Sequence, residues 1–137
     1  MNGLLRTLWA AFEPRETAEQ RSMRLLKAHL NPLQRRQFDE HGWFDVVGGQ
    51  SGRRYRVYRA YVTNVQEVGI DGACVQVLCF SPCGHLPLGD VLLAQKVALE
   101  AFEGEALAVA GRWPASLARR YTSIRLVLRT AGSANPR

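Results

Sequence analysis

The spacing of apolar residues changes at Trp43, from a helical period before it to an alternation of two after it. The alternating runs are joined by short links, such as the glycine-rich stretch 48–52 and the Asp71-Gly72 pair. Strands joined by links this short pair antiparallel, because a parallel crossover needs a dozen or more residues. We therefore predict a meander of three to four strands. The expected strands cover residues 44–47, 53–60, 61–68 (a separate strand or a bent continuation of the preceding one) and 74–80.

Helices are expected before this sheet. Residues 15–30 have helical periodicity, with acidic residues near the start and a lysine near the end. The Asn31-Pro32 pair is typical of an N-cap followed by a first-turn proline, and Gln34 is placed for a capping box. Gly42 is expected to close this helix.

The longest expected helix covers residues 91–110 and follows the sheet. Gly104 is expected to weaken it midway or to mark its end. Its carboxylates Glu100, Glu103 and Glu105 are expected on the surface of the helix. The opposite, apolar face would cover the sheet, and it comprises Val91, Leu92, Ala98, Leu99 and Phe102.

Both ends of the chain carry apolar stripes that need a surface to cover them. The first stripe has helical spacing, and a helix of about ten residues is marginal in water alone, so it docks either on its own domain or on a partner. Residues 122–129 alternate as a strand, which pairs with its own sheet or with a neighbour's. The candidate partner-binding residues are Leu4, Leu5, Leu8, Trp9, Phe12, Ile124, Leu126 and Leu128.

A chain of 137 residues is long enough to bury a hydrophobic core without disulfides or a structural metal. Its 47% hydrophobic and 22% charged residues are typical of a globular protein. We predict an α+β fold with an α+β core at residues 31–112. A helical extension at 1–30 precedes this core, and an extended arm at 113–137 follows it.

The sequence also indicates a compartment. Its three cysteines are too few and too clustered for a secreted disulfide scaffold, which favours a reducing environment. The apolar start is unlike a signal peptide because Arg6 interrupts it and Glu13-Pro14 follows. No run is long enough to span a membrane. We expect a cytoplasmic protein, or a virion protein if the chain is phage-encoded.

The excess of basic over acidic residues is the first feature that could indicate a binding function. Eighteen Lys and Arg residues against twelve Asp and Glu give a formal charge of +6, which suits either binding of a polyanion or solubility alone. One face of the strand at 53–60 could clamp a phosphate backbone and stack a base. The alternative is a face whose arginines pair with Glu67 or Asp45 across the sheet. The candidate nucleic-acid-binding residues are Arg54, Arg56, Tyr58, Arg119, Arg120 and Arg125.

Other chemistry has weaker support. The stretch 48–53 resembles a phosphate loop, but it lacks the Lys-Ser/Thr ending and precedes a strand, so a hairpin turn is expected. No motif for nucleophilic catalysis is present, and we expect neither an enzyme nor a cofactor. We also expect no metal site, because no Cys-x-x-Cys occurs. The candidate metal ligands would be Cys74, Cys79, Cys83 and His85.

Several short motifs lie within residues 31–110: Gly52-Arg-Arg-Tyr-Arg-Val57, Asn64-Val65, Leu78-Cys-Phe80, His85-Leu-Pro-Leu-Gly-Asp90, Leu93-Ala-Gln-Lys96 and Leu99-Glu100. In these motifs the chain resembles a group of small uncharacterised bacterial and phage proteins with no established activity. The resemblance implies one cohesive core and no particular chemistry. The two terminal segments lie outside it.

Together these features favour a non-catalytic subunit of a larger assembly, such as a phage particle. Its expected partners are other protein subunits, in a homo- or hetero-oligomer, contacted through the terminal helix and strand. The alternative is a small basic nucleic-acid-binding protein that uses the Arg/Tyr strand face.

Overall fold

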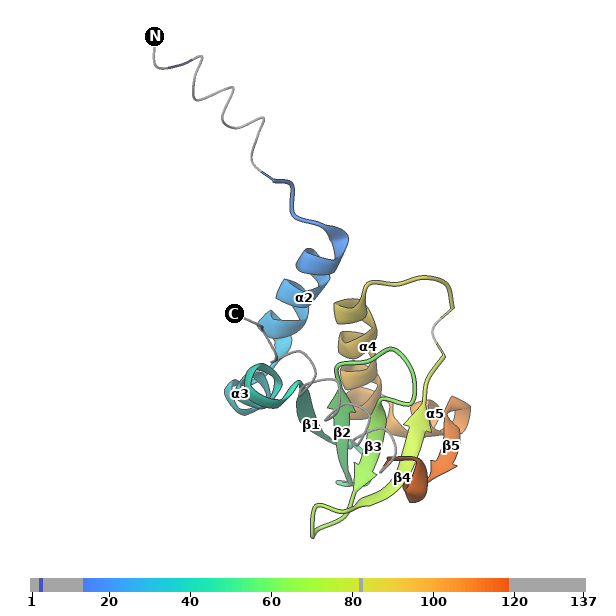
Figure 1. Cartoon of the computed structure of the whole chain (residues 1–137). Coiled ribbons are helices and arrows are strands. Elements are labelled where there is room, and N and C mark those ends of the chain that lie inside the picture. The colour runs from blue at the N-terminus through green and yellow to red at the C-terminus, as the bar shows by residue number, and fades with distance from the viewer. Residues whose placement is uncertain (1–2, 4–13, 82, 119–137) are drawn as a thin grey trace, which may run out of the picture.

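The computed structural model describes residue 3 and residues 14–81 and 83–118, which form an α+β fold (Figure 1). The predicted fold class, with helices and an antiparallel meander, is confirmed. In chain order the elements are α2 (Ala18–His29), α3 (Pro32–His41), β1 (Trp43–Val47), β2 (Arg54–Tyr58), β3 (Val65–Val68), β4 (Cys74–Cys79), α4 (Leu88–Ala101), α5 (Glu103–Val109) and β5 (Gly111–Pro114).

The sheet has five antiparallel strands in the order β1-β2-β3-β4-β5, so each strand pairs with the next one in sequence. The register places Val46 opposite Tyr55 and Val57 opposite Val65. Strands β2 and β3 are shorter than predicted because residues 59–64 form their connection, closed by a 2.7 Å hydrogen bond from the backbone N–H of Tyr58 to the carbonyl of Asn64.

The fifth strand, β5, adds to the predicted meander. Directly after the end of the helix predicted over residues 91–110, residues Gly111–Pro114 form a strand that pairs with β4, with Arg112 opposite Leu78. A strand of four residues that begins with a glycine and ends with a proline is too short to show a period. β5 also crosses the predicted boundary at residue 112, so the first residues of the expected arm belong to the sheet.

Helices cover one face of the sheet. Figure 1 shows α4 across this face, α2 against α4 and α3 beside β1. Leu26 of α2 is fully buried in the same core as the strands, so α2 shares this core although it lies in the predicted 1–30 extension. The fully buried apolar residues that form the centre of the core are Leu26, Phe44, Val46, Tyr55, Val57, Val65, Leu78, Leu92 and Leu99.

Both helices before the sheet begin with capping boxes. Asn31 accepts a 2.9 Å hydrogen bond from the backbone N–H of Gln34, whose side chain accepts one from the N–H of Asn31 at 3.1 Å, as predicted. Gly42 ends α3 in the left-handed region, with φ of 73°. Thr17 caps α2 in the same way as Asn31 caps α3, and α2 therefore begins at Ala18 rather than at residue 15.

The long helix predicted over residues 91–110 is two helices, α4 and α5, separated at Phe102. The backbone of Phe102 leaves the helical region, with φ of −136° and ψ of 42°. Two predictions for this segment are wrong: Phe102 is 57% exposed rather than buried, and Glu103 is 1% exposed rather than on the surface. The break turns Glu103 inward. Val91, Leu92 and Leu99 are buried as predicted.

Candidate functional site

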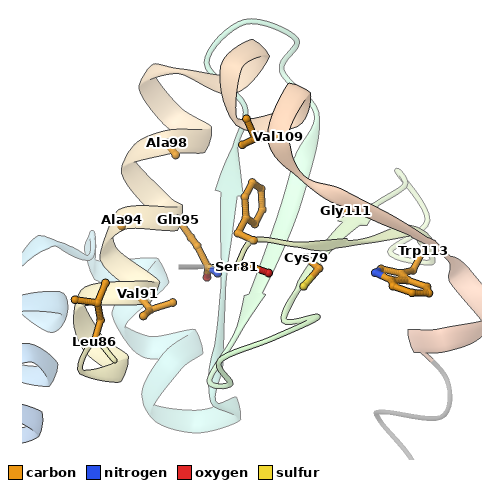
Figure 2. Close-up of a pocket in the computed structure, with 11 residues that line it drawn as sticks. Cys79, Ser81, Leu86, Val91, Ala94, Gln95, Ala98, Val109, Gly111 and Trp113 are labelled. Carbon is orange, nitrogen blue, oxygen red and sulfur yellow. The ribbon is translucent and has the colours of Figure 1, made fainter. Parts of the chain in front are cut away.

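A pocket of about 510 Å³ lies between α4 and the β4–β5 end of the sheet (Figure 2). None of its lining residues carries a charge, and most of them are apolar. The lining residues are Cys79, Phe80, Ser81, Leu86, Val91, Ala94, Gln95, Ala98, Val109, Gly111 and Trp113.

The sequence of α4 explains the shape of one wall. Val91, Ala94, Gln95 and Ala98 follow helical spacing and therefore share one face of α4. On this face Ala94 is exposed and Ala98 is half-buried. The other wall comes from the region around β5, where the Trp113 side chain is 50% exposed. The pocket thus presents small side chains on one side and an aromatic ring on the other.

The amide of Gln95 in the pocket wall is held by a second buried amide. The Nδ2 of Asn64 donates to Oε1 of Gln95 at 2.8 Å, and the Nε2 of Gln95 donates to Oδ1 of Asn64 at 3.0 Å. Asn64 is fully buried and Gln95 is 4% exposed. This reciprocal pair satisfies both amides within the chain. The wall of the pocket is consequently suited to apolar groups rather than to acid–base chemistry.

The pocket adjoins one of two unlike sheet edges. At the β1 edge, Gln34 of α3 donates from Nε2 to the carbonyl of Asp45 at 2.9 Å, and Gln37 accepts from the backbone N–H of Asp45 at 3.0 Å. At the opposite edge all four residues of β5 are exposed, and no described strand lies beyond it. Helix α3 therefore occupies edge groups of β1, whereas β5 has no such cover within the described residues.

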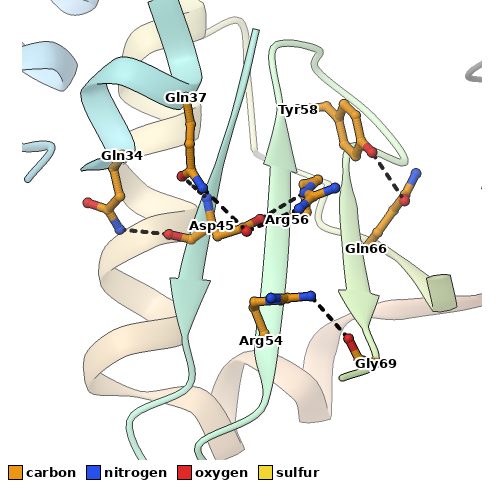
Figure 3. A network of polar contacts seen from close by, with 8 residues as sticks. All are labelled: Gln34, Gln37, Asp45, Arg54, Arg56, Tyr58, Gln66 and Gly69. Atoms are coloured by element: carbon orange, nitrogen blue, oxygen red, sulfur yellow. Dashed lines mark hydrogen bonds and ion pairs between the residues drawn. The ribbon is translucent and has the colours of Figure 1, made fainter. Parts of the chain in front are cut away.

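The predicted Arg/Tyr face of β2 exists, and its central arginine is engaged inside the chain (Figure 3). Arg56 donates to the two carboxylate oxygens of Asp45 at 2.8 and 3.1 Å. Its guanidinium lies 3.7 Å from the ring centroid of Trp43. This matches the structural alternative considered for this face, in which arginines pair across the sheet. The charge of Arg56 is balanced by Asp45.

The neighbours of Arg56 also bond within the sheet. Arg54 donates to the carbonyl of Gly69 at 3.1 Å, and the hydroxyl of Tyr58 donates to Gln66 at 3.4 Å (Figure 3). The remaining candidates for nucleic-acid binding, Arg119, Arg120 and Arg125, lie outside the described residues. Within the described residues, the structure brings together only Arg54, Arg56 and Tyr58.

The turn that resembles a phosphate loop does hold an anion, which is a carboxylate of the same chain. Glu103 accepts hydrogen bonds from the backbone N–H groups of Gln50 and Ser51 at 2.9 and 2.8 Å. It also accepts from the hydroxyls of Ser51 and Tyr55, the latter at 2.7 Å. Sequence reasoning missed this contact because the turn and Glu103 lie about fifty residues apart. The Gly48-Gly49 pair was the available signal, since it leaves room for a close neighbour.

The environment of Glu103 shifts two pKa values in opposite directions. Burial alone would raise the pKa of Glu103, but the hydrogen bonds from Ser51, Tyr55 and Gln50 lower it to about 2. Burial and the adjacent carboxylate raise the pKa of Tyr55 to about 12. Both groups therefore keep one protonation state near neutral pH, with Glu103 ionised and Tyr55 neutral. This arrangement anchors the turn to α5.

The three cysteines are free thiols. Cys74 and Cys79 lie on β4 and are half-buried, and Cys79 lines the pocket, whereas Cys83 and His85 are exposed in the segment between β4 and α4. The described part of the chain holds no group of three or more His, Cys, Asp or Glu side chains that could bind a metal ion.

The predicted partner-binding residues of the two ends lie outside the described residues. They are Leu4, Leu5, Leu8, Trp9, Phe12, Ile124, Leu126 and Leu128. The pocket and the exposed β5 edge, which sequence reasoning missed, lie in the described part.

Among the described residues, no helix combines the length and the apolar character needed to cross a membrane. No family model matches the sequence, and no curated protein or solved structure is significantly similar to it.

Proposed function

We propose that this chain is a non-catalytic subunit of a larger protein assembly. In this proposal the β5 edge and the adjacent pocket form one contact surface, and the two terminal segments form others. The contrast between the sheet edges carries the proposal: α3 occupies the β1 edge, whereas β5 is exposed along its whole length beside an apolar pocket. An exposed strand edge is able to pair with another chain.

The side chains around the pocket support a protein contact. Trp113 is 50% exposed and Val109 is 79% exposed, and both line the pocket. Tryptophan is among the residues that most often dominate protein–protein binding energy. The volume of about 510 Å³ is in the range of pockets that enclose a ligand or an anchoring side chain.

The titratable groups support a role without catalysis. The two strongest pKa shifts in the described residues belong to Glu103 and Tyr55, which bond to each other in the interior. A catalytic group needs access to a substrate. In the uncharged pocket, the one side chain with an ionisable group is Cys79.

The first partner that we propose is another copy of this chain. The second is a different protein subunit, in a hetero-oligomer. The resemblance to bacterial and phage proteins makes a phage particle the assembly to examine first. Nucleic-acid binding through Arg54, Arg56 and Tyr58 is less well supported, because Asp45 already balances the charge of Arg56.

The test is the mass of the full chain in solution, measured by light scattering after size-exclusion chromatography. We expect concentration-dependent multiples of 15.3 kDa. Deletion of residues 1–12 or of residues 119–137 is expected to reduce this mass and to leave the circular dichroism of the core unchanged. A full chain that stays at 15.3 kDa at every concentration would overturn assembly from copies of this chain, and two deletion variants that assemble like the full chain would overturn the role of the terminal segments.

A second measurement separates the two classes of partner. DNA or RNA binding that weakens steeply with salt, with a flatter slope in an Arg54→Ala/Arg56→Ala variant, would favour the nucleic-acid alternative.

A further inference from the structure

Helix α2 begins close to the pocket. Both carboxylate oxygens of Glu19, in the first turn of α2, lie 3.2 Å from the backbone N–H of Leu88, which donates to them. The helices pack closely here, because a Cβ on Gly89 would lie 2.3 Å from the backbone of Ser22. Leu86, two residues before the start of α4, lines the pocket. The N-terminal end of α2 is therefore fixed beside one end of the pocket.

The chain nevertheless points away from its own pocket at this place. Residues 14–17 are exposed, and Figure 1 shows them running from the end of α2 away from α4. The carboxylate of Glu16 bonds to Arg24 at 2.8 Å, on an exposed side of α2. The described residues that precede α2 therefore lead away from the pocket of their own chain.

The residues before position 14 have apolar side chains that suit an apolar pocket. Their apolar side chains recur with helical spacing, and a helix this short needs a surface to be stable. Ala94 and Ala98 allow a second helix to approach α4, and Trp113 flanks the opposite side. An amphipathic helix that places anchoring side chains in an apolar groove is a common mode of recognition.

We propose that the pocket binds residues 4–12 of a second copy of this chain, as a helix whose Trp9 and Phe12 side chains enter the pocket. This inference rests on the proposed function and names its partner. Every copy both donates a segment and offers a pocket. Reciprocal exchange closes a two-fold dimer, whereas one-way exchange builds a ring or a filament.

Cys79 in the pocket wall allows a direct test on the full chain. In a Cys74→Ser/Cys83→Ser background, Cys79 is the one native thiol, and Phe12→Cys adds one on the apolar face of the segment. Copper phenanthroline with oxygen oxidises the two thiols to a disulfide. We expect covalent dimers on a non-reducing gel, and mixed dimers when two differently tagged chains are combined.

The matched control is Ala10→Cys in the same background. At 100° per residue, position 10 lies on the helix face opposite the apolar stripe. We expect it to give far less dimer than Phe12→Cys. Equal yields from both positions, or loss of both thiols within a single chain, would overturn the proposal; the second result would mean that the segment occupies its own pocket.

Filling the pocket is the second test. Ala94→Trp places an indole in the pocket at an exposed position of α4, and the control Val97→Trp adds the same ring at an exposed position outside the pocket lining. We expect Ala94→Trp to weaken association by at least about ten-fold and Val97→Trp to leave it unchanged. Circular dichroism checks that both variants fold, and the disulfide test is independent of this substitution.

The two experiments distinguish the inference from the proposed function. If the full chain associates, yet Ala94→Trp associates equally well and Phe12→Cys forms no interchain disulfide, the inference is wrong and the assembly role stands. If the full chain does not associate at all, self-assembly, the first form of the proposed function, fails together with the inference.

Discussion

The two edges of the sheet, at β1 and at β5, are built from different kinds of contact. At the β1 side, Gln34 and Gln37 of α3 bond to the backbone of Asp45, and the turn after β1 encloses the carboxylate of Glu103. At the β5 side the strand is exposed and the adjacent pocket is apolar. Polar groups with partners inside the chain stabilise the subunit itself, whereas apolar surface that the described residues leave uncovered is suited to stabilise an association. Substitutions on the two sides should therefore affect different measurements.

The largest expected effect is on the β1 side. Glu103→Ala removes a carboxylate that accepts four hydrogen bonds and leaves the buried Tyr55 hydroxyl without its acceptor. We expect the free energy of unfolding, measured in urea, to fall by about 3 kcal/mol. The control Glu105→Ala changes an exposed carboxylate of the same helix and should cost under about 0.5 kcal/mol. Equal losses in both variants would contradict the anchoring role.

The same carboxylate should make stability depend on pH. The pKa of Glu103 is about 2 in the folded chain against an ordinary value of 4.5, so the unfolded chain binds the proton first as pH falls. Its contribution of about 3 kcal/mol is present above pH 4.5 and is lost as pH falls toward 2. The free energy of unfolding of the wild type minus that of Glu103→Gln, measured between pH 6 and 2, should shrink accordingly. A constant difference would refute the shift.

On the β5 side, Trp113→Ala should act mainly on association. The indole is half-exposed in the single chain, so its removal should lower the free energy of unfolding by under about 1 kcal/mol. Association should weaken by about 2 kcal/mol, or roughly 30-fold in the dissociation constant. Sedimentation velocity and urea unfolding of the same sample measure both. A variant that unfolds more easily but associates normally would reverse the comparison.

The smallest expected effect tests the closed edge itself. Gln34→Ala removes the donor to the carbonyl of Asp45 and half of the capping box of α3. We expect a loss of about 1 kcal/mol in the free energy of unfolding and no change in association. Gln37→Ala, which frees the backbone N–H of Asp45, should behave alike. If either variant gained a new association, the β1 edge would be a latent contact surface.

Several parts of the fold could be predicted from the sequence because their causes are local. The alternation after Trp43 and the short links between strands predicted the meander. Asn31 and Gln34, three residues apart in the sequence, predicted the capping box of α3. The division of β2 into a buried Tyr55 face and a polar Arg56 face follows from the period of two alone.

The candidate site could be predicted much less well. The amino acids of the pocket wall on α4 share a helical face, which the spacing of Ala94 and Ala98 indicates, but the opposite wall depends on β5, which has no periodic signal. The apolar stripes at residues 4–12 and 122–129 were recognised from the spacing of their apolar residues. The surfaces on which these two segments dock stay predictions.

The sequence by itself determined the capping box of α3, the meander from β1 to β4 and the alternating faces of β2, because these features depend on neighbours within a few residues. Only the tertiary structure decided that the long helix breaks at Phe102, that Glu103 fills the turn after β1, and that β5 rather than β1 is the exposed edge. Each of these outcomes depends on groups that meet from distant parts of the chain. A hydrogen bond or a cavity between such groups leaves no periodic trace in the sequence.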